Sequence, residues 1–244
     1  DRYRDYQNLD GIIYTVGNEQ DYHFQVLFLV LAKLGYSWAK NCQHLSYGMV
    51  DLPTGKMKSR EGTVVDADDL IDEIVEKAKE ATMERGHIEG MSEAEVTELC
   101  KTIGLGGLKY YLLKVDPKKR MMFNPEESIE LNGNTGPFIQ YAYARIQSLL
   151  SRAKGEELAE GITLLPEEIE LIKQMNEAPK ILEEAASNLS PAIVANYLFE
   201  LVKSFNHFYQ NVSIFNEEDS NLQEMRLVIA KNTAGIIKNF CSVL

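Results

Sequence analysis

Residues 55–62 hold the side chains of this chain that are best suited to chemistry on a phosphate. They read Gly-Lys-Met-Lys-Ser-Arg-Glu-Gly, so three cations lie between two glycines. Glycine lets the backbone turn tightly and approach a ligand, while lysine and arginine donate hydrogen bonds to phosphate oxygens. Positioned cations stabilise the negative charge that develops during phosphoryl or nucleotidyl transfer. The alternative is a solvated surface loop whose lysines have no such role.

Two further segments give this one a context. Residues 131–145 read Leu-Asn-Gly-Asn-Thr-Gly-Pro-Phe-Ile-Gln-Tyr-Ala-Tyr-Ala-Arg, and residues 13–24 read Ile-Tyr-Thr-Val-Gly-Asn-Glu-Gln-Asp-Tyr-His-Phe. The three segments together resemble, in order along nearly the whole chain, the arginyl-tRNA synthetases, a family of class I aminoacyl-tRNA synthetases. The cationic segment resembles the Lys-Met-Ser-Lys-Ser signature. Residues 131–145 resemble the start of the anticodon-binding domain, and residues 13–24 a strand-to-helix turn of the nucleotide-binding fold.

The beginning of the chain predicts a strand, a helix and a second strand. Residues 11–17 are a β-branched and aromatic run that ends in glycine, which is typical of a buried strand. A helix is expected over about 20–34, with Gly35 as its stop, and residues 42–50 predict the second strand. This order is the βαβ unit of a parallel sheet, in which ligands bind at the carboxyl ends of the strands.

From Asp66 onward apolar residues recur at helical spacing. Helices are expected over roughly 92–115, 125–153, 166–187, 190–212 and 217–240. The prolines that favour helix starts are Pro125, Pro166 and Pro191, and the candidate caps are Asn124 and Ser190. The expected fold class is mixed α/β and then all-α: the remnant of a parallel-sheet nucleotide-binding fold, followed by a helical bundle.

The resemblance divides the chain into three expected parts. They are the end of the catalytic domain with the signature loop (1–65), a helical connector (66–124) and the anticodon-binding domain (125–244).

The composition is that of an ordinary globular protein, with 45% apolar and 25% charged residues. No run approaches the roughly 18 to 20 apolar residues of a membrane span, and no signal peptide opens the chain. Three cysteines without metal-site spacing predict free thiols in a reducing cytoplasm and no protein-bound metal. The net charge of −12 argues against a protein that coats nucleic acid, but it allows local recognition of a structured RNA. We expect a cytoplasmic monomer without a membrane or DNA partner.

Candidate substrate contacts lie near the two strand ends. The resemblance implies an L-arginine-binding role for Gln20 and places His23 near the nucleotide. It also implies that backbone groups of Gly48, Met49 and Val50 hold the adenine ring of ATP, as in class I synthetases. The alternatives are a solvated helix start for Gln20 and a hydrogen-bonded helix histidine for His23.

The cationic segment departs from the general class I pattern. When it is aligned on Lys56, Ser59 stands where the second lysine is usual, and Lys58 and Arg60 flank it. Arginyl enzymes often lack that lysine. Lys56 is the first candidate for contact with the phosphates and Arg60 the second, and the choice among the four catalytic candidates stays open.

Candidate tRNA contacts lie on two of the expected helices. Phe138, Tyr141 and Arg145 are spaced i, i+3, i+7 and would share one helix face. Aromatic rings and a guanidinium can stack on splayed bases and hold phosphate. The alternative is a core stripe. A comparable polar and aromatic set on a later helix includes Asn206 and Tyr209.

The resemblance implies a ligase that attaches arginine to tRNA(Arg) through an arginyl-adenylate, with ATP and Mg²⁺ as a substrate complex. The first class I signature, a His-Ile-Gly-His-like turn, is absent from these 244 residues. Because the chain starts without an initiator methionine, we expect an excised piece, and because this signature is missing, we expect it to be inactive alone. The alternatives are a non-catalytic RNA-binding module derived from a synthetase and a cysteinyl-tRNA synthetase-like enzyme. The latter would normally show zinc-ligand cysteines.

Overall fold

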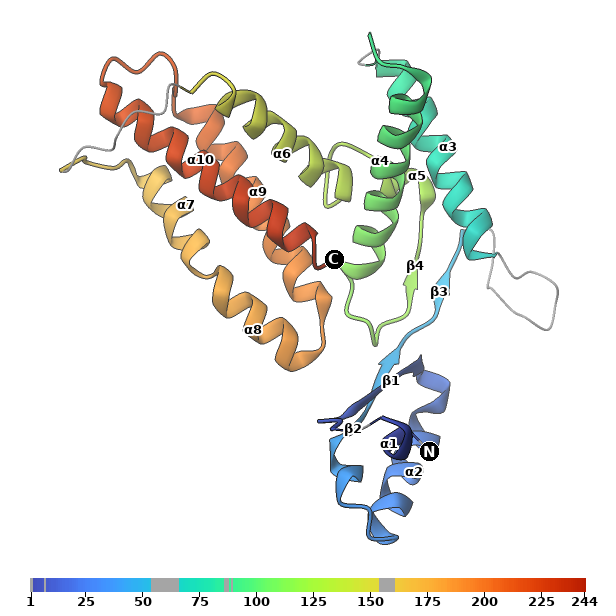
Figure 1. The fold of residues 1–244 in the computed structure, drawn as a ribbon. Helices are drawn as coiled ribbons and strands as arrows, with labels where there is room; N and C mark the ends of the chain where they lie inside the picture. The colour runs from blue at the N-terminus through green and yellow to red at the C-terminus, as the bar shows by residue number, and fades with distance from the viewer. Residues whose placement is uncertain (1, 7, 54–65, 86–87, 89, 154–160) are drawn as a thin grey trace.

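The computed structural model describes residues 2–6, 8–53, 66–85, 88, 90–153 and 161–244. Figure 1 shows a small α/β unit at the N-terminus, followed by a mostly helical remainder. The first elements are α1 (Arg2–Asp5), β1 (Ile12–Gly17), α2 (Asp21–Lys33), β2 (Cys42–Tyr47) and β3 (Val50–Asp51). This arrangement is the mixed α/β and then all-α class that the sequence predicts.

The βαβ prediction is confirmed. β1 and β2 pair in parallel, from Ile12 opposite Cys42 to Gly17 opposite Tyr47. The helix between them, α2, presents Phe24 to the sheet, where its ring lies 5.1 Å from that of Tyr14. Gly35 follows the end of α2 with a φ of +86°, a backbone conformation that residues other than glycine rarely adopt.

The predicted strand over 42–50 is two strands in the structure. The chain leaves the first sheet at Gly48, whose N–H donates to Pro117 O at 2.7 Å. A Cβ at this position would clash with the backbone of Lys119, so only glycine fits. β3 then pairs in parallel with β4 (Met121–Met122), a strand that the sequence analysis missed because it is only two residues long.

The middle of the chain forms a second small core. α3 (Ala67–Arg85) packs along α4 (Glu93–Leu113), and the one-turn helix α5 (Pro125–Ser128) lies against α4. Apolar side chains from both long helices surround Phe123, which is fully buried. Ser92 and Glu95 form a capping box that starts α4.

The last part is a bundle of long helices. Its elements are α6 (Gly136–Leu150), α7 (Pro166–Asn176), α8 (Ala178–Asn188), α9 (Pro191–Asn211) and α10 (Ser220–Cys241). α10 packs against α6, α7 and α9 (Figure 1). The core is built largely from α9, whose Leu198, Leu201, Val202 and Phe205 are fully buried. Within the described residues, no helix is long and apolar enough to cross a membrane.

Two predicted helices are each divided in the structure. The expected helix over 125–153 is interrupted after α5, and Thr135 starts α6 by accepting from Phe138 N at 3.3 Å. The expected helix over 166–187 breaks at Glu177, because Pro179 in the first turn of α8 has no N–H to continue the bonding of α7. Asn124 caps α5 as predicted, whereas Ser190 stands at the start of α9 without a side-chain cap bond.

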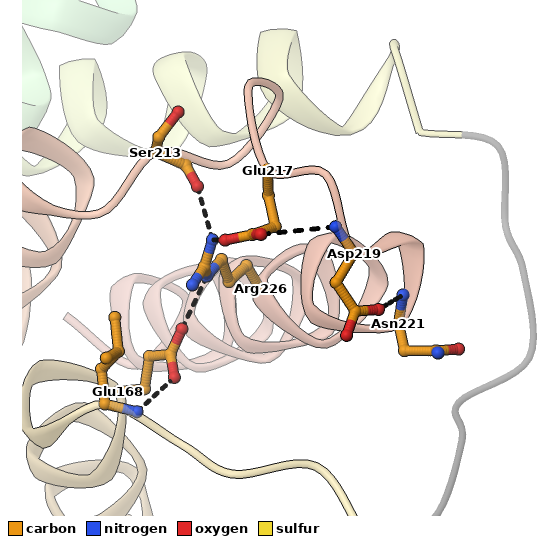
Figure 2. Close-up of polar contacts among 7 residues, drawn as sticks. Glu168, Ser213, Glu217, Asp219, Asn221 and Arg226 are labelled. Carbon is orange, nitrogen blue, oxygen red and sulfur yellow. Dashed lines mark hydrogen bonds and ion pairs between the residues drawn. The ribbon is translucent and has the colours of Figure 1, made fainter.

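A buried ion-pair network joins α7 to α10 (Figure 2). Arg226 Nε donates to Glu168 Oε1 at 2.7 Å, and its Nη1 donates to Glu217 Oε2 and to Ser213 O, each at 2.7 Å. Glu168 also accepts from Leu165 N at 2.7 Å, which caps α7. The Glu168 and Arg226 side chains are 0% and 4% exposed. The Arg226 guanidinium and the Glu168 carboxylate can be buried because they pair with each other and because Arg226 also donates to Ser213 and Glu217.

Candidate nucleotide and RNA sites

Gln20 and His23 lie at the start of α2, just beyond the carboxyl end of β1. Gln20 ends a 3₁₀ turn (Asn18–Gln20) and is exposed, as is His23. The His23 ring meets Phe24 edge-on, with centroids 5.7 Å apart. Both side chains therefore face solvent beside a strand end, where a ligand could reach them. Their substrate contacts stay predictions.

His44 is a neighbour that the sequence analysis did not single out. Its Nε2 lies 2.9 Å from Val16 O and its Nδ1 3.3 Å from Asp21 Oδ1. The ring also stacks on Phe24 at 4.3 Å. These contacts tie the start of α2 to both strands and so hold Gln20 and His23 in place. The only sequence signal was a histidine inside a predicted strand.

The backbone of Gly48–Val50 forms the corner between the two sheets. Gly48 N–H donates to Pro117 O, and Met49 O accepts from Met121 N at 3.0 Å. For Gly48 C=O and Met49 N–H the structure shows no partner among the described residues. Gly48 is buried, and Met49 is 37% exposed. The corner therefore offers one acceptor and one donor beside an apolar side chain.

The four catalytic candidates, Lys56, Lys58, Ser59 and Arg60, lie outside the described residues. The described chain before them is anchored in the core between α3 and α4. Leu52 is buried there with Ile74 and Phe123. On the far side, Asp66 begins α3 by accepting from Asp68 N at 3.0 Å.

Four of the five tRNA candidates meet in one surface group, which we call the Arg145 cluster: Tyr141, Arg145, Asn206 and Tyr209. The Arg145 guanidinium lies 4.8 Å from the Tyr141 ring centroid and 5.4 Å from that of Tyr209. Its Nη1 donates to Asn206 Oδ1 at 2.9 Å. Tyr141 and Tyr209 are 50% and 40% exposed. Residues from α6 and α9 thus present two rings and a held guanidinium to solvent.

Phe138 lies apart from the Arg145 cluster. It is half-buried and packs against the core, with its ring 5.6 Å from that of Phe199. The buried face of α6 consists of Ile139, Ala142, Ile146 and Leu149. Phe138 lies beside that face, whereas Tyr141 is exposed. The alternative interpretation, a residue of the hydrophobic core, therefore fits Phe138 better than Tyr141. For all five candidate residues, contact with tRNA stays a prediction.

The segment 131–145 joins the bundle to α4. Tyr110 Oη lies 2.6 Å from Asn134 Oδ1 and 2.8 Å from Ala195 O, while Lys114 Nζ donates to Asn134 O at 2.8 Å. Gly136 packs against the backbone of Gly106 with no room for a Cβ. Burial raises the pKa of Tyr110 and lowers that of Lys114. Gly136 and Asn134 of this motif therefore serve close packing of the bundle against α4.

The described residues contain no group of three or more His, Cys, Asp or Glu side chains arranged to hold a metal ion.

Comparisons with known proteins give a family match for each half of the chain. Residues 1–124 match the family model for the catalytic domain of class I tRNA synthetases (R), and residues 139–244 match the DALR anticodon binding domain. The arginine–tRNA ligase of Flavobacterium psychrophilum is 56% identical over 244 residues, which are 100% of this chain and 41% of that protein. The ligase of Bacteroides thetaiotaomicron is 49% identical over 243 residues, which are 97% of this chain and 40% of that protein.

The fold has solved counterparts. An arginyl-tRNA synthetase from Thermus thermophilus superposes with a TM-score of 0.86 at 24% identity, covering 96% of this chain and 40% of that one. A putative arginyl-tRNA synthetase from Campylobacter jejuni gives a TM-score of 0.70 at 15% identity. At these identities the likeness supports the fold alone. The chain spans about two fifths of the length of the curated relatives described above.

Proposed function

This chain belongs to the arginyl-tRNA synthetase family, and we propose that it forms the later part of an arginine–tRNA ligase. In the proposed reaction the carboxylate of L-arginine attacks the α-phosphate of ATP, which gives an arginyl-adenylate and pyrophosphate. A terminal ribose hydroxyl of tRNA(Arg) then takes the arginyl group and releases AMP. The observation that carries the proposal is the presence, in one chain, of a class I catalytic match and an anticodon-domain match.

The corner at Gly48–Val50 supports a nucleotide site. A backbone acceptor and a backbone donor side by side complement the amino group and a ring nitrogen of adenine. The cationic segment follows within a few residues, so Lys56 or Arg60 would meet the phosphates, and Mg²⁺ would arrive with ATP. Gln20 would contact arginine and His23 the nucleotide. The proposed catalysis consists of positioning and charge stabilisation.

The surface of α2 supports the idea that a longer synthetase contains these residues. Tyr22 and Leu29 on α2 are 79% and 63% exposed, and Leu34, directly after the helix, is 67% exposed. Such an apolar surface on a helix beside a two-stranded sheet is typical of a protein–protein or domain contact. The relatives at 48–56% identity, all arginine–tRNA ligases, favour this function over a separate RNA-binding module or a cysteinyl enzyme. The proposed enzyme is a cytoplasmic monomer with arginine, ATP and tRNA(Arg) as its partners.

We predict that the 244 residues alone will not form arginyl-adenylate. The reason is that they contain no His-Ile-Gly-His-like turn, whose groups face the ATP phosphates in class I synthetases. The measurement is arginine-dependent exchange between ATP and labelled pyrophosphate, with tRNA(Arg) present. Exchange above that of a protein-free blank would contradict the prediction.

We predict that the Arg145 cluster binds the anticodon stem-loop and that Tyr141→Ala weakens charging. Stacking of a base on an aromatic ring contributes about 1–3 kcal/mol, so kcat/KM for tRNA should fall by about one to two orders of magnitude. The measurement is aminoacylation of tRNA(Arg) by the longer synthetase that carries these residues.

Two matched variants separate stacking from folding. Tyr141→Phe keeps the ring and should charge tRNA nearly as well as the wild type. Leu182→Ala removes a 39%-exposed apolar side chain from α8 of the same bundle and should leave charging unchanged. If the charging rate of Tyr141→Ala falls only in step with its melting temperature, Tyr141 has a packing role and the tRNA contact is wrong.

A further inference from the structure

A short segment after α4, residues 117–123, holds the corner at Gly48–Val50 from outside the first sheet. The backbone hydrogen bonds that join the two stretches include Gly48 N to Pro117 O at 2.7 Å, Met121 N to Met49 O at 3.0 Å, and Phe123 N to Asp51 O at 2.7 Å. The close fit of Gly48 against Lys119 adds a steric constraint. The corner is therefore shaped by residues about seventy positions further along the chain.

One ion pair reinforces these backbone bonds. Arg120 donates from Nε to Asp51 Oδ2 and from Nη2 to Asp51 Oδ1, the latter at 2.8 Å. The pair is thus bidentate, which fixes the direction of both side chains as well as their separation. Only 15% of the Asp51 side chain is exposed, against 52% of Arg120. Asp51 is the last residue of β3 and directly follows Val50, so its position sets that of the corner.

We propose that Arg120 is a positioning residue of the ATP site, which acts through Asp51 on the backbone of Gly48–Val50. This inference rests on the proposed function, because it assigns the corner to adenine. Arg120 itself does not touch the nucleotide. Without the Arg120 guanidinium, β3 keeps its backbone hydrogen bonds but loses the bidentate constraint that Arg120 places on Asp51. The donor and acceptor of the corner then shift relative to the adenine ring. The segment that leads from α4 towards the RNA-binding bundle thereby completes the nucleotide site.

The test is steady-state aminoacylation by the longer synthetase, with ATP varied and arginine and tRNA(Arg) saturating. We expect Arg120→Gln to raise the KM for ATP about tenfold, with kcat within about twofold of the wild type, because adenine contacts act equally in the ground and transition states. The KM for arginine should stay unchanged. Arg120→Lys keeps the positive charge but cannot form the bidentate hydrogen bonds to Asp51, so it should restore only part of the ATP affinity.

A double-mutant cycle tests whether Arg120 acts through Asp51. In an Asp51→Asn background, Arg120→Gln should raise the KM for ATP no further. Lys203→Gln breaks a doubly bonded surface ion pair with Glu200 on α9 and should leave the KM for ATP unchanged. Ile74→Val loosens the core between α3 and α4, where Ile74 is 1% exposed, and controls for a general loss of stability.

The possible failures are distinguishable. If the wild-type synthetase does not charge tRNA(Arg) with arginine, the proposed function is wrong. If it does, but Arg120→Gln leaves the KM for ATP unchanged, adds to Asp51→Asn, or changes that KM no more than Ile74→Val at equal melting temperature, then Arg120 has no positioning role.

Discussion

Replacing Lys56 by alanine in the longer synthetase should lower the rate of adenylate formation by about 10²–10³-fold, with little change in arginine binding. A positioned cation that meets the developing charge on pyrophosphate contributes about 2.7–4 kcal/mol to transition-state stabilisation, as one oxyanion-hole donor does. Because that charge is greater in the transition state than in ATP, kcat falls rather than affinity. The measurement is arginine-dependent ATP–pyrophosphate exchange with saturating tRNA(Arg).

Two further variants make this result specific to the position of the charge. Arg60→Ala tests the second candidate, and the larger loss identifies the cation that meets the phosphates. Lys180→Ala removes one lysine from the surface of α8, where its side chain is 77% exposed, and should leave exchange unchanged. A strong rise in the KM for arginine at unchanged kcat would place Lys56 in substrate binding instead and contradict the proposed role.

The second large effect concerns the network of Glu168, Arg226 and Glu217. Arg226→Met should lower the free energy of unfolding by roughly 3–5 kcal/mol, because it leaves the Glu168 carboxylate buried without its cation. The measurement is urea denaturation of the 244-residue chain. The double variant Glu168→Gln with Arg226→Met removes both charges and keeps an acceptor for Leu165 N, so it should recover part of the loss.

An exposed ion pair supplies the control. Lys203→Met breaks the pair with Glu200, whose side chains are 52% and 56% exposed, and should cost at most about 1 kcal/mol. Equal losses for Lys203→Met and Arg226→Met would show that burial of the network adds nothing to its importance.

The same network predicts a dependence of stability on pH. Hydrogen bonds from Arg226 hold the pKa of Glu217 below its ordinary value of 4.5. A carboxylate with a depressed pKa contributes stability that is complete above its unfolded-state pKa and is lost as the pH falls through the folded-state value. The melting temperature should therefore decrease as the pH is lowered from about 4.5. Arg226→Met should make this decrease less steep. An identical acid profile for the two proteins would refute this contribution of Glu217.

Local features of the sequence were enough to predict most elements. Prolines stand in the first turns of α5, α7 and α9, Asn124 caps α5, and Gly35 follows the end of α2, because each acts through the backbone of its own turn. The parallel pairing of β1 and β2 followed from the helix between them. The spacing of Phe138, Tyr141 and Arg145 predicted one shared face of α6. In the structure Arg145 lies over the Tyr141 ring, whereas Phe138 packs against the core.

The predicted lengths of elements were less accurate, since a run of suitable residues does not show where tertiary contacts end a helix. The prediction of one helix over 125–153 did not take Gly133 into account. Its φ of +81° is incompatible with a helix and lies in the loop before α6. The strands β3 and β4 are two residues long and therefore show no periodicity in the sequence. They form because they pair with each other in parallel.

Only the tertiary structure decided which distant residues meet. Arg145 and Asn206 are 61 positions apart, and Arg120 and Asp51 are 69 apart, so no local pattern relates them. In the sequence, Tyr141 and Tyr209 belonged to two separate sets, and the packing of α6 beside α9 made them one cluster. Glu168 and Arg226 look like ordinary surface charges until α7 and α10 bury them together. Pattern and capping act within a turn, whereas these contacts depend on how whole helices pack, and that is a property of the complete core.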